Sequence, residues 1–199
     1  MADSRYDAHT ALIVTDVQND FTDPAGNLYV AGGEALVPTM NTEIERARAA
    51  DALVVYSLDY HPPDTPHFEK DGGVWPVHCV AGSWGSALHP DLRRVEGPHV
   101  HKGTGGEDGY SAFSLRDPES GAQDVTELDA ILREHGITRV VVIGLALDYC
   151  VKETVLDARR FGYDVTLLHD ATAPVNLAPD DGARALRMIE AAGAEVAAA

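Results

Sequence analysis

Short apolar runs rich in β-branched residues recur along this 199-residue chain, and amphipathic patterns typical of helices lie between them. Parallel strands buried on both faces have this composition, because helices cover them on either side. Strands that alternate with helices predict an α/β fold in which one parallel sheet lies between two helix layers. We expect a single domain over residues 1–199, built as a three-layer α/β/α sandwich. The expected strands are Thr10–Val14, Leu53–Leu58, His99–Lys102, Arg139–Ile143, Asp164–Leu168 and a last short strand at Ala194–Val196.

Four segments between these strands have helical patterns. In the first, Leu36, Met40 and Ile44 are spaced by four residues and so share one helix face. Each of the other three ends in front of a glycine, the residue that most readily adopts the left-handed conformation after a helix. The expected helices are Gly33–Ala50, Asp124–His135, Asp148–Phe161 and Asp180–Ala192.

Two long stretches, Asp59–Pro98 and Gly103–Gly121, break the alternation and are rich in Gly, Pro, His and aromatic residues. Loops of this length in a compact domain usually carry function. A disordered insertion is the alternative, but the aromatic side chains favour loops that pack. These side chains are Phe68, Trp75, Trp84 and Phe113.

The formal net charge is −17, from 15 Lys and Arg against 32 Asp and Glu residues. A chain with this negative charge is repelled by a nucleic-acid backbone or an anionic membrane, and we expect neither as a partner. No apolar run approaches the roughly 18 residues that a membrane-spanning helix needs. The first residues lack the basic and apolar segments of a secretory signal. We therefore expect a cytoplasmic protein whose two cysteines, Cys79 and Cys150, are thiols.

Chemically capable side chains follow four of the expected strands. Asp16 follows the first, Asp59 and His61 follow the second, and Lys102 ends the stretch at residues 99–102. The segment 144–150, which ends in a cysteine, follows the strand at residues 139–143. Ligands of such sheets lie beyond the carboxyl ends of the strands. We therefore expect these side chains to converge on one site.

Cys150 is the candidate nucleophile. A lone cysteine is more often a small buried hydrophobic residue, but this one lies where a helix begins after a strand. There the positive end of the helix dipole stabilises a thiolate, and backbone N–H groups can hold an oxyanion. Asp16 and Lys102 are the candidates for the proton acceptor and for the cation that steadies the anions. Taken singly, Asp16 could be a turn or cap residue and Lys102 a surface charge.

A second group of residues has the composition of a metal site. Imidazole and carboxylate ligands suit Zn²⁺, Fe²⁺ or Mn²⁺. The alternative is a set of surface histidines, since the chain has 9 His, and we place His89, His99 and His101 in that class. Cys79 follows a candidate ligand directly, so its side chain should point away and be structural. The candidate ligands are Asp59, His61, His67 and His78.

In combination, these segments resemble the nicotinamidase/pyrazinamidase branch of the isochorismatase-like hydrolases. The resemblance runs in that family's motif order from about Thr10 to Val196. The Asp, Lys and Cys motifs are common to the whole superfamily, and the Asp/His set narrows the match to nicotinamidases. The motifs are Val14-Thr-Asp-Val-Gln-Asn-Asp-Phe21, Asp59-Tyr-His61, Trp75-Pro-Val-His-Cys79, His101-Lys-Gly103 and Gly144-Leu-Ala-Leu-Asp-Tyr-Cys150.

The resemblance implies an amidohydrolase with a six-stranded parallel sheet. Its implied substrate is nicotinamide, or a similar amide such as pyrazinamide, which would be hydrolysed to the acid and ammonia. It also implies one divalent metal ion, with Zn²⁺ expected and Fe²⁺ or Mn²⁺ as alternatives. Many relatives are dimers or tetramers, so a homo-oligomer is an open expectation.

Residue by residue, the resemblance also implies roles in the site. Tyr149 stands where some relatives carry His, which bears on substrate tolerance and removes no catalytic group. The backbone N–H groups of Ala146 and Cys150 would form the oxyanion hole, with a cis peptide between Leu145 and Ala146. The implied triad is Asp16, Lys102 and Cys150, the implied metal ligands are Asp59, His61, His67 and His78, and the implied pyridine pocket is Phe21, Trp75 and Tyr110.

Three other functions compete with this one. The first is another amidase or an isochorismatase of the same fold, although isochorismate hydrolysis requires no metal. The second is a metallohydrolase whose metal-bound water attacks while Cys150 is structural. The third is a binding module without activity, which the intact Asp16, Lys102 and Cys150 argue against. Fold alone decides none of these.

Overall fold

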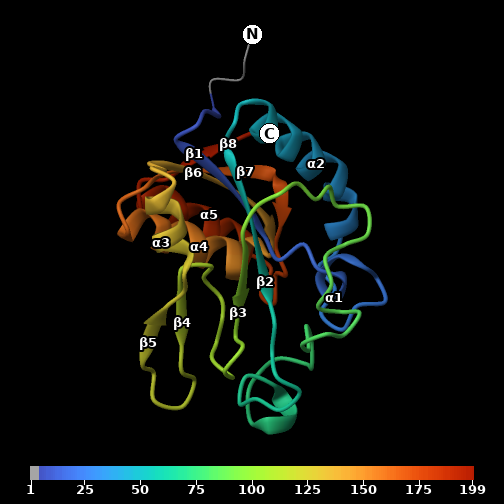
Figure 1. The fold of residues 1–199 in the computed structure, drawn as a ribbon. Coiled ribbons are helices and arrows are strands. Elements are labelled where there is room, and N and C mark those ends of the chain that lie inside the picture. Colours follow the sequence, from blue (N-terminus) through green and yellow to red (C-terminus); the bar gives the residue numbers. More distant parts are fainter. Residues whose placement is uncertain (1–4) are drawn as a thin grey trace.

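The computed structural model describes residues 5–199, and six of its strands form one parallel sheet (Figure 1). The strands are β1 (Thr10–Thr15), β2 (Leu53–Asp59), β3 (His99–Lys102), β6 (Arg139–Leu145), β7 (Asp164–Ala173) and β8 (Glu195–Ala197). Their order across the sheet is β3-β2-β1-β6-β7-β8, and every neighbouring pair is parallel. The predicted six-stranded parallel sheet is confirmed.

Four helices cover the two faces of this sheet. They are α2 (Gly33–Ala49), α3 (Leu128–Glu134), α4 (Lys152–Arg160) and α5 (Asp181–Ala191). Leu12 and Val14 of β1 share one core with Met40 of α2, whereas Ile13 shares a second core with α3, α4 and α5. Figure 1 shows α2 on one side of the sheet and the other three helices on the opposite side. The predicted three layers are therefore confirmed.

One predicted helix, Asp124–His135, begins later than expected. Residues Gln123–Val125 form the strand β5, which pairs in an antiparallel hairpin with β4 (Ser114–Arg116). The helix α3 starts only at Leu128, whose backbone N–H donates to Thr126 Oγ1 over 3.2 Å. Residues that the pattern assigned to the first helical turn belong to the hairpin instead, so the predicted start of this helix was wrong.

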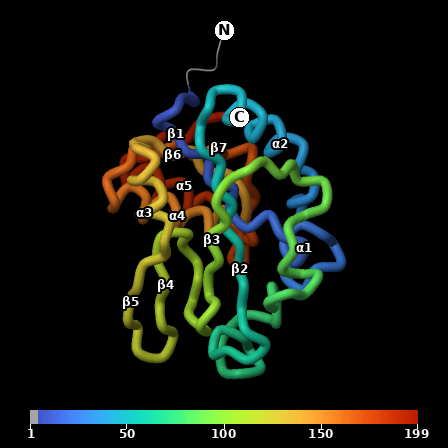
Figure 2. Tube along the Cα trace, viewed as in Figure 1, coloured from blue at the N-terminus to red at the C-terminus, as the bar shows by residue number. Residues whose placement is uncertain are grey.

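The two long loops pack, with one exception. Phe68, Trp75 and Phe113 are buried, as predicted, but Trp84 keeps 53% of its surface exposed and that prediction was wrong. The first loop contains a short turn, η1 (Glu69–Asp71), and the second leads into the β4–β5 hairpin. Figure 2 shows that both project from the same edge of the sheet. Within residues 5–199, no helix combines the length and apolar character that crossing a membrane requires.

Candidate active site

The carboxyl ends of β1, β2 and β3 each place one charged side chain at the same edge of the sheet. Asp16 follows β1 with φ 50°, a left-handed conformation that aspartate tolerates better than most residues. Asp59 is the last residue of β2 and Lys102 the last of β3. All three side chains are buried. The structure thus brings together three residues that lie far apart in the sequence, as expected.

Lys102 lies between the two carboxylates. Its Nζ is 2.6 Å from Asp16 Oδ2 and 3.0 Å from Asp59 Oδ1. Burial by itself would lower the pKa of Lys102, but the two carboxylates outweigh it and hold that pKa well above its usual range. Ser57 Oγ also donates to Asp16 Oδ1 over 2.7 Å. One ammonium therefore connects Asp16 to the neighbouring Asp59.

The carboxylates respond differently to this environment. Burial raises the pKa of Asp16, and the attraction of Lys102 offsets this only in part. Burial also acts on Asp59, but Lys102 together with His61 and His78 holds the pKa of Asp59 well below its usual range. A carboxyl with a raised pKa is the better proton acceptor near neutral pH. Of the two carboxylates, Asp16 is therefore the better candidate for the base.

Cys150 reaches the same place from the other half of the chain. It lies in η2 (Leu147–Val151), a turn between β6 and α4, and its Sγ and oxygens of Asp16 and Asp59 lie within 4.8 Å of one another. Burial raises the pKa of the Cys150 thiol well above its usual range, although the Lys102 ammonium acts in the opposite direction. A raised thiol pKa means that Cys150 needs a base to become a nucleophile.

The turn before Cys150 starts with a cis peptide bond between Leu145 and Ala146, as predicted. The Ala146 carbonyl accepts from the N–H groups of Tyr149 and Val151, both over 3.1 Å. Gly144 has φ 116°, and a β-carbon there would lie only 2.0 Å from the Thr15 carbonyl oxygen. Glycine is required because β1 and β6 approach so closely at this point. The oxyanion-hole role of the Ala146 and Cys150 amides stays a prediction.

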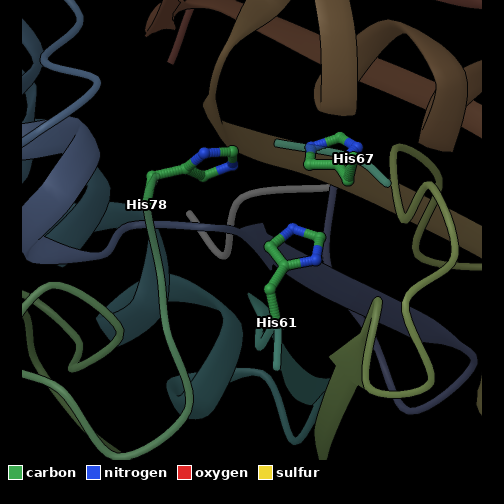
Figure 3. Close-up of side chains that lie close together, drawn as sticks. All are labelled: His61, His67 and His78. Carbon is green, nitrogen blue, oxygen red and sulfur yellow. The ribbon is translucent and has the colours of Figure 1, made fainter. Parts of the chain in front are cut away.

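Three histidines form a buried cluster (Figure 3). Ring nitrogens of His61, His67 and His78 lie within 4.8 Å of one another. Asp59 Oδ2 is 3.8 Å from His61 Nε2 and 3.7 Å from His78 Nε2. The four predicted ligands therefore converge. Cys79, as expected, is buried outside this cluster, and both cysteines are free.

The chemistry of these side chains fits a divalent metal ion. Both ring nitrogens of His61 are buried and have no hydrogen-bond partner among residues 5–199. His67 Nδ1 lies 2.6 Å from Asp108 Oδ1, and His78 Nδ1 lies 2.7 Å from the Pro76 carbonyl oxygen. Each of these two rings donates from Nδ1, so Nε2 keeps a lone pair for a metal. Imidazole nitrogens beside a carboxylate are a ligand set that suits Zn²⁺, Fe²⁺ or Mn²⁺.

A pocket is lined by residues of the histidine cluster and by the cysteine. Trp75 Nε1 donates to the Tyr110 hydroxyl over 2.8 Å, and the Trp75 ring meets Tyr149 edge-on at 4.8 Å between centroids. The lining of the pocket thus combines aromatic side chains with a thiol and two imidazoles. Its lining residues are Phe21, Leu28, Val30, Asp59, His67, Trp75, His78, Tyr110, Ala146, Tyr149, Cys150 and Val175.

Sequence reasoning missed several residues that hold the site together. Gln18 is buried, and its side chain donates to the Asp59 carbonyl oxygen over 2.7 Å and accepts from the Asp59 N–H over 2.8 Å. Ser57 and Asp108 contact Asp16 and His67 as described above. Of these residues, Gln18 alone could have been suspected from the sequence, because it belongs to a run of polar residues that follows Asp16.

Comparison with known proteins identifies the family. Residues 10–199 match the isochorismatase domain. A nicotinamidase of Escherichia coli (strain K12) is 39% identical over an alignment that covers 92% of each chain. The crystal structure of a Pyrococcus horikoshii pyrazinamidase in complex with zinc has a TM-score of 0.85 and 35% identity, over 96% of this chain and 99% of that one.

A third comparison involves a bound molecule. The crystal structure of an L. infantum protein in complex with nicotinate has a TM-score of 0.86 and 36% identity, over 96% of this chain and 93% of that one. The fold, the site and these three relatives agree. The chain is an amidohydrolase of the isochorismatase-like family and belongs to its nicotinamidase/pyrazinamidase branch.

Proposed function

We propose that this protein hydrolyses nicotinamide, and similar amides such as pyrazinamide, to the acid and ammonia, with Cys150 as the nucleophile. The observation that carries the proposal is the placement of Cys150 beside Asp16 in an aromatic-lined pocket that also contains residues of the histidine cluster. A flat pyridine ring that carries both an amide and a ring nitrogen offers one group to the thiol and one to the histidine cluster. The E. coli nicotinamidase and the L. infantum nicotinate complex support the same substrate class.

The first half of the reaction transfers the acyl group to sulfur. Cys150 Sγ attacks the amide carbon while Asp16 takes the thiol proton, which its raised pKa favours. The N–H groups of Ala146 and Cys150 are proposed to hold the oxygen of the tetrahedral intermediate. Asp16 then passes the proton to the leaving nitrogen, ammonia departs, and a thioester remains on Cys150.

The second half releases the acid. Asp16, again a carboxylate, takes a proton from water, and the resulting hydroxide attacks the thioester carbon. The bond from carbon to sulfur breaks, the sulfur regains a proton through Asp16, and nicotinate leaves. Lys102 keeps its positive charge throughout and balances the anions that form beside it.

The metal is proposed to be held by Asp59, His61, His67 and His78, with Zn²⁺ as the expected ion and Fe²⁺ or Mn²⁺ as alternatives. When bound, it supplies a Lewis-acidic position for the pyridine nitrogen, reached directly or through a water. Phe21, Trp75 and Tyr110 are proposed to limit the tilt of the ring. With both ends of the substrate fixed, attack by Cys150 becomes an oriented, effectively unimolecular step.

Ammonia release from nicotinamide by purified protein tests this function. Zinc-loaded enzyme should release ammonia, chelator-treated enzyme should release far less, and added zinc should restore the rate. Benzamide, which has the amide and no ring nitrogen, should be a poor substrate. Comparable kcat/KM values for benzamide and nicotinamide would refute the proposed role of the metal. A loaded enzyme that releases no ammonia from nicotinamide would refute the function itself.

A further inference from the structure

Asp108 is a mostly buried carboxylate that the proposed reaction does not use. It lies in the second long loop, its side chain is 16% exposed, and its Oδ1 is 2.6 Å from His67 Nδ1. We propose that Asp108 is a positioning residue for the metal centre, one that fixes the ring of His67 so that Nε2 faces the other ligands. This inference rests on the proposed function in one respect, namely that the histidine cluster binds a metal.

The hydrogen bond determines which nitrogen His67 can offer. A ring that donates its Nδ1 proton to a carboxylate keeps the lone pair on Nε2, and the anion makes that nitrogen a stronger ligand. His78 donates to a backbone carbonyl oxygen, and neither ring nitrogen of His61 has a partner among residues 5–199. His67 is thus the histidine of the cluster whose Nδ1 faces a carboxylate outside the ligand set. The effect of Asp108 should therefore pass through His67.

Asp108 is itself held in place by the hairpin. Its backbone N–H donates to the Arg116 carbonyl oxygen over 2.7 Å, and the Arg116 N–H donates back over 3.0 Å. Thr65 Oγ1 donates to the Gly106 carbonyl oxygen over 3.0 Å and accepts from the His67 N–H over 3.2 Å. The loop that carries Asp108 and the loop that carries His67 are therefore joined twice, once through Thr65 and once through the carboxylate.

The start of the same loop lies against a second ligand. Gly103 has φ 73°, and a β-carbon there would lie 2.4 Å from the His61 ring. A side chain cannot fit at this position without displacing His61. The segment 103–108 thus contacts His61 at its beginning and His67 at its end. This arrangement gives the second long loop a role in holding the imidazoles at fixed positions.

Zinc affinity of the purified, metal-free protein tests the proposal. Asp108→Ala should weaken zinc binding by about 10–100-fold, the usual effect of removing such a partner of a metal-binding histidine. Asp108→Asn keeps an acceptor and loses the charge, so its loss should be smaller. Glu107→Gln is the matched control. Glu107 is the neighbour of Asp108 in sequence but contacts the Gly105 N–H, and its substitution removes one negative charge, as Asp108→Asn does. This control should bind zinc as the wild type does.

A double-mutant comparison separates positioning from a general effect on the fold. In a His67→Ala background, Asp108→Ala should cause no further loss of zinc affinity, because its route to the metal is gone. Metal-free Asp108→Asn should alkylate at Cys150 as fast as metal-free wild type. Wild-type zinc affinity in both Asp108 variants, or an equal loss with and without His67, would overturn the proposal and leave the metal centre intact. Failure of the wild type itself to bind zinc would overturn both.

Discussion

Replacing Lys102 by methionine removes the charge that connects Asp16 and Asp59 while keeping a side chain of similar length. At an effective dielectric constant of about 20, unit charges at the observed 2.6 and 3.0 Å attract by about 6 kcal/mol per pair. The cost of burying three charges and the repulsion between the carboxylates oppose much of this. Broken buried ion pairs in other proteins cost about 3–5 kcal/mol, and we expect Lys102→Met to lower the free energy of unfolding by that amount.

Urea unfolding of metal-free wild type and Lys102→Met at neutral pH measures this loss. The double variant Asp16→Asn/Lys102→Met is the companion, because it also removes one of the two carboxylates left without a cation. It should regain part of the lost stability. A loss below about 1 kcal/mol in the single variant, the range of an exposed ion pair, would show that the ammonium does not hold the carboxylates together.

The same variant reports on the nucleophile. The Lys102 ammonium opposes the effect of burial on the pKa of the Cys150 thiol, so its removal should raise that pKa further. Alkylation of Cys150 by iodoacetamide should then be slower than in the wild type at neutral pH. Equal alkylation rates from about pH 6 to pH 9 would show that Lys102 does not tune the thiol.

Three further predictions address other parts of the chain. Cys150→Ala should lower kcat by more than about 10⁴-fold, and wild-type enzyme quenched during turnover should carry an acyl adduct on this residue by mass spectrometry; a fully active variant would exclude the thioester. Asp148 accepts from both N–H groups of residues 175–176 over 2.8 Å, so Asp148→Ala should cost about 2–4 kcal/mol in urea unfolding, with Asp148→Asn losing less. Burial and the bond to Asp129 raise the pKa of Tyr163 above its value of 10.0 in an unfolded chain, so the protein should lose stability as the pH rises above 10.0. Tyr163→Phe should flatten that loss in thermal melts, and identical slopes would refute the assignment.

The middle of the sheet could be predicted because β1, β2 and β6 are buried on both faces and so consist largely of apolar residues. The run Thr10–Val14 differs from the observed β1 by one residue, and the run Leu53–Leu58 differs from β2 by one. The charged residues at the carboxyl ends were predictable for the same reason. Once the strand ends are known, the geometry of a parallel sheet brings those ends to one edge.

The hairpin and the contacts around the ligands could not be predicted in this way. Gln123–Val125 is exposed and has only one apolar residue, so no apolar alternation marks it as a strand. Asp124 is equally typical of a helix start. Asp108 meets His67 across 41 positions of the sequence. Such a contact depends on how two loops fold over each other, and no local pattern records it.

The sheet order has a consequence for biosynthesis. β1 is a central strand whose neighbours are β2, made soon after it, and β6, which pairs Thr10 with Arg139. One edge of β1 therefore stays unpaired while the ribosome adds more than half of the chain, and every residue of β1 is buried in the folded protein. An open strand edge can pair with other chains, and this edge of β1 is closed only when β6 has been made. Cys150 is translated after Asp16, Asp59 and Lys102, so the nucleophile is the last catalytic group to be added.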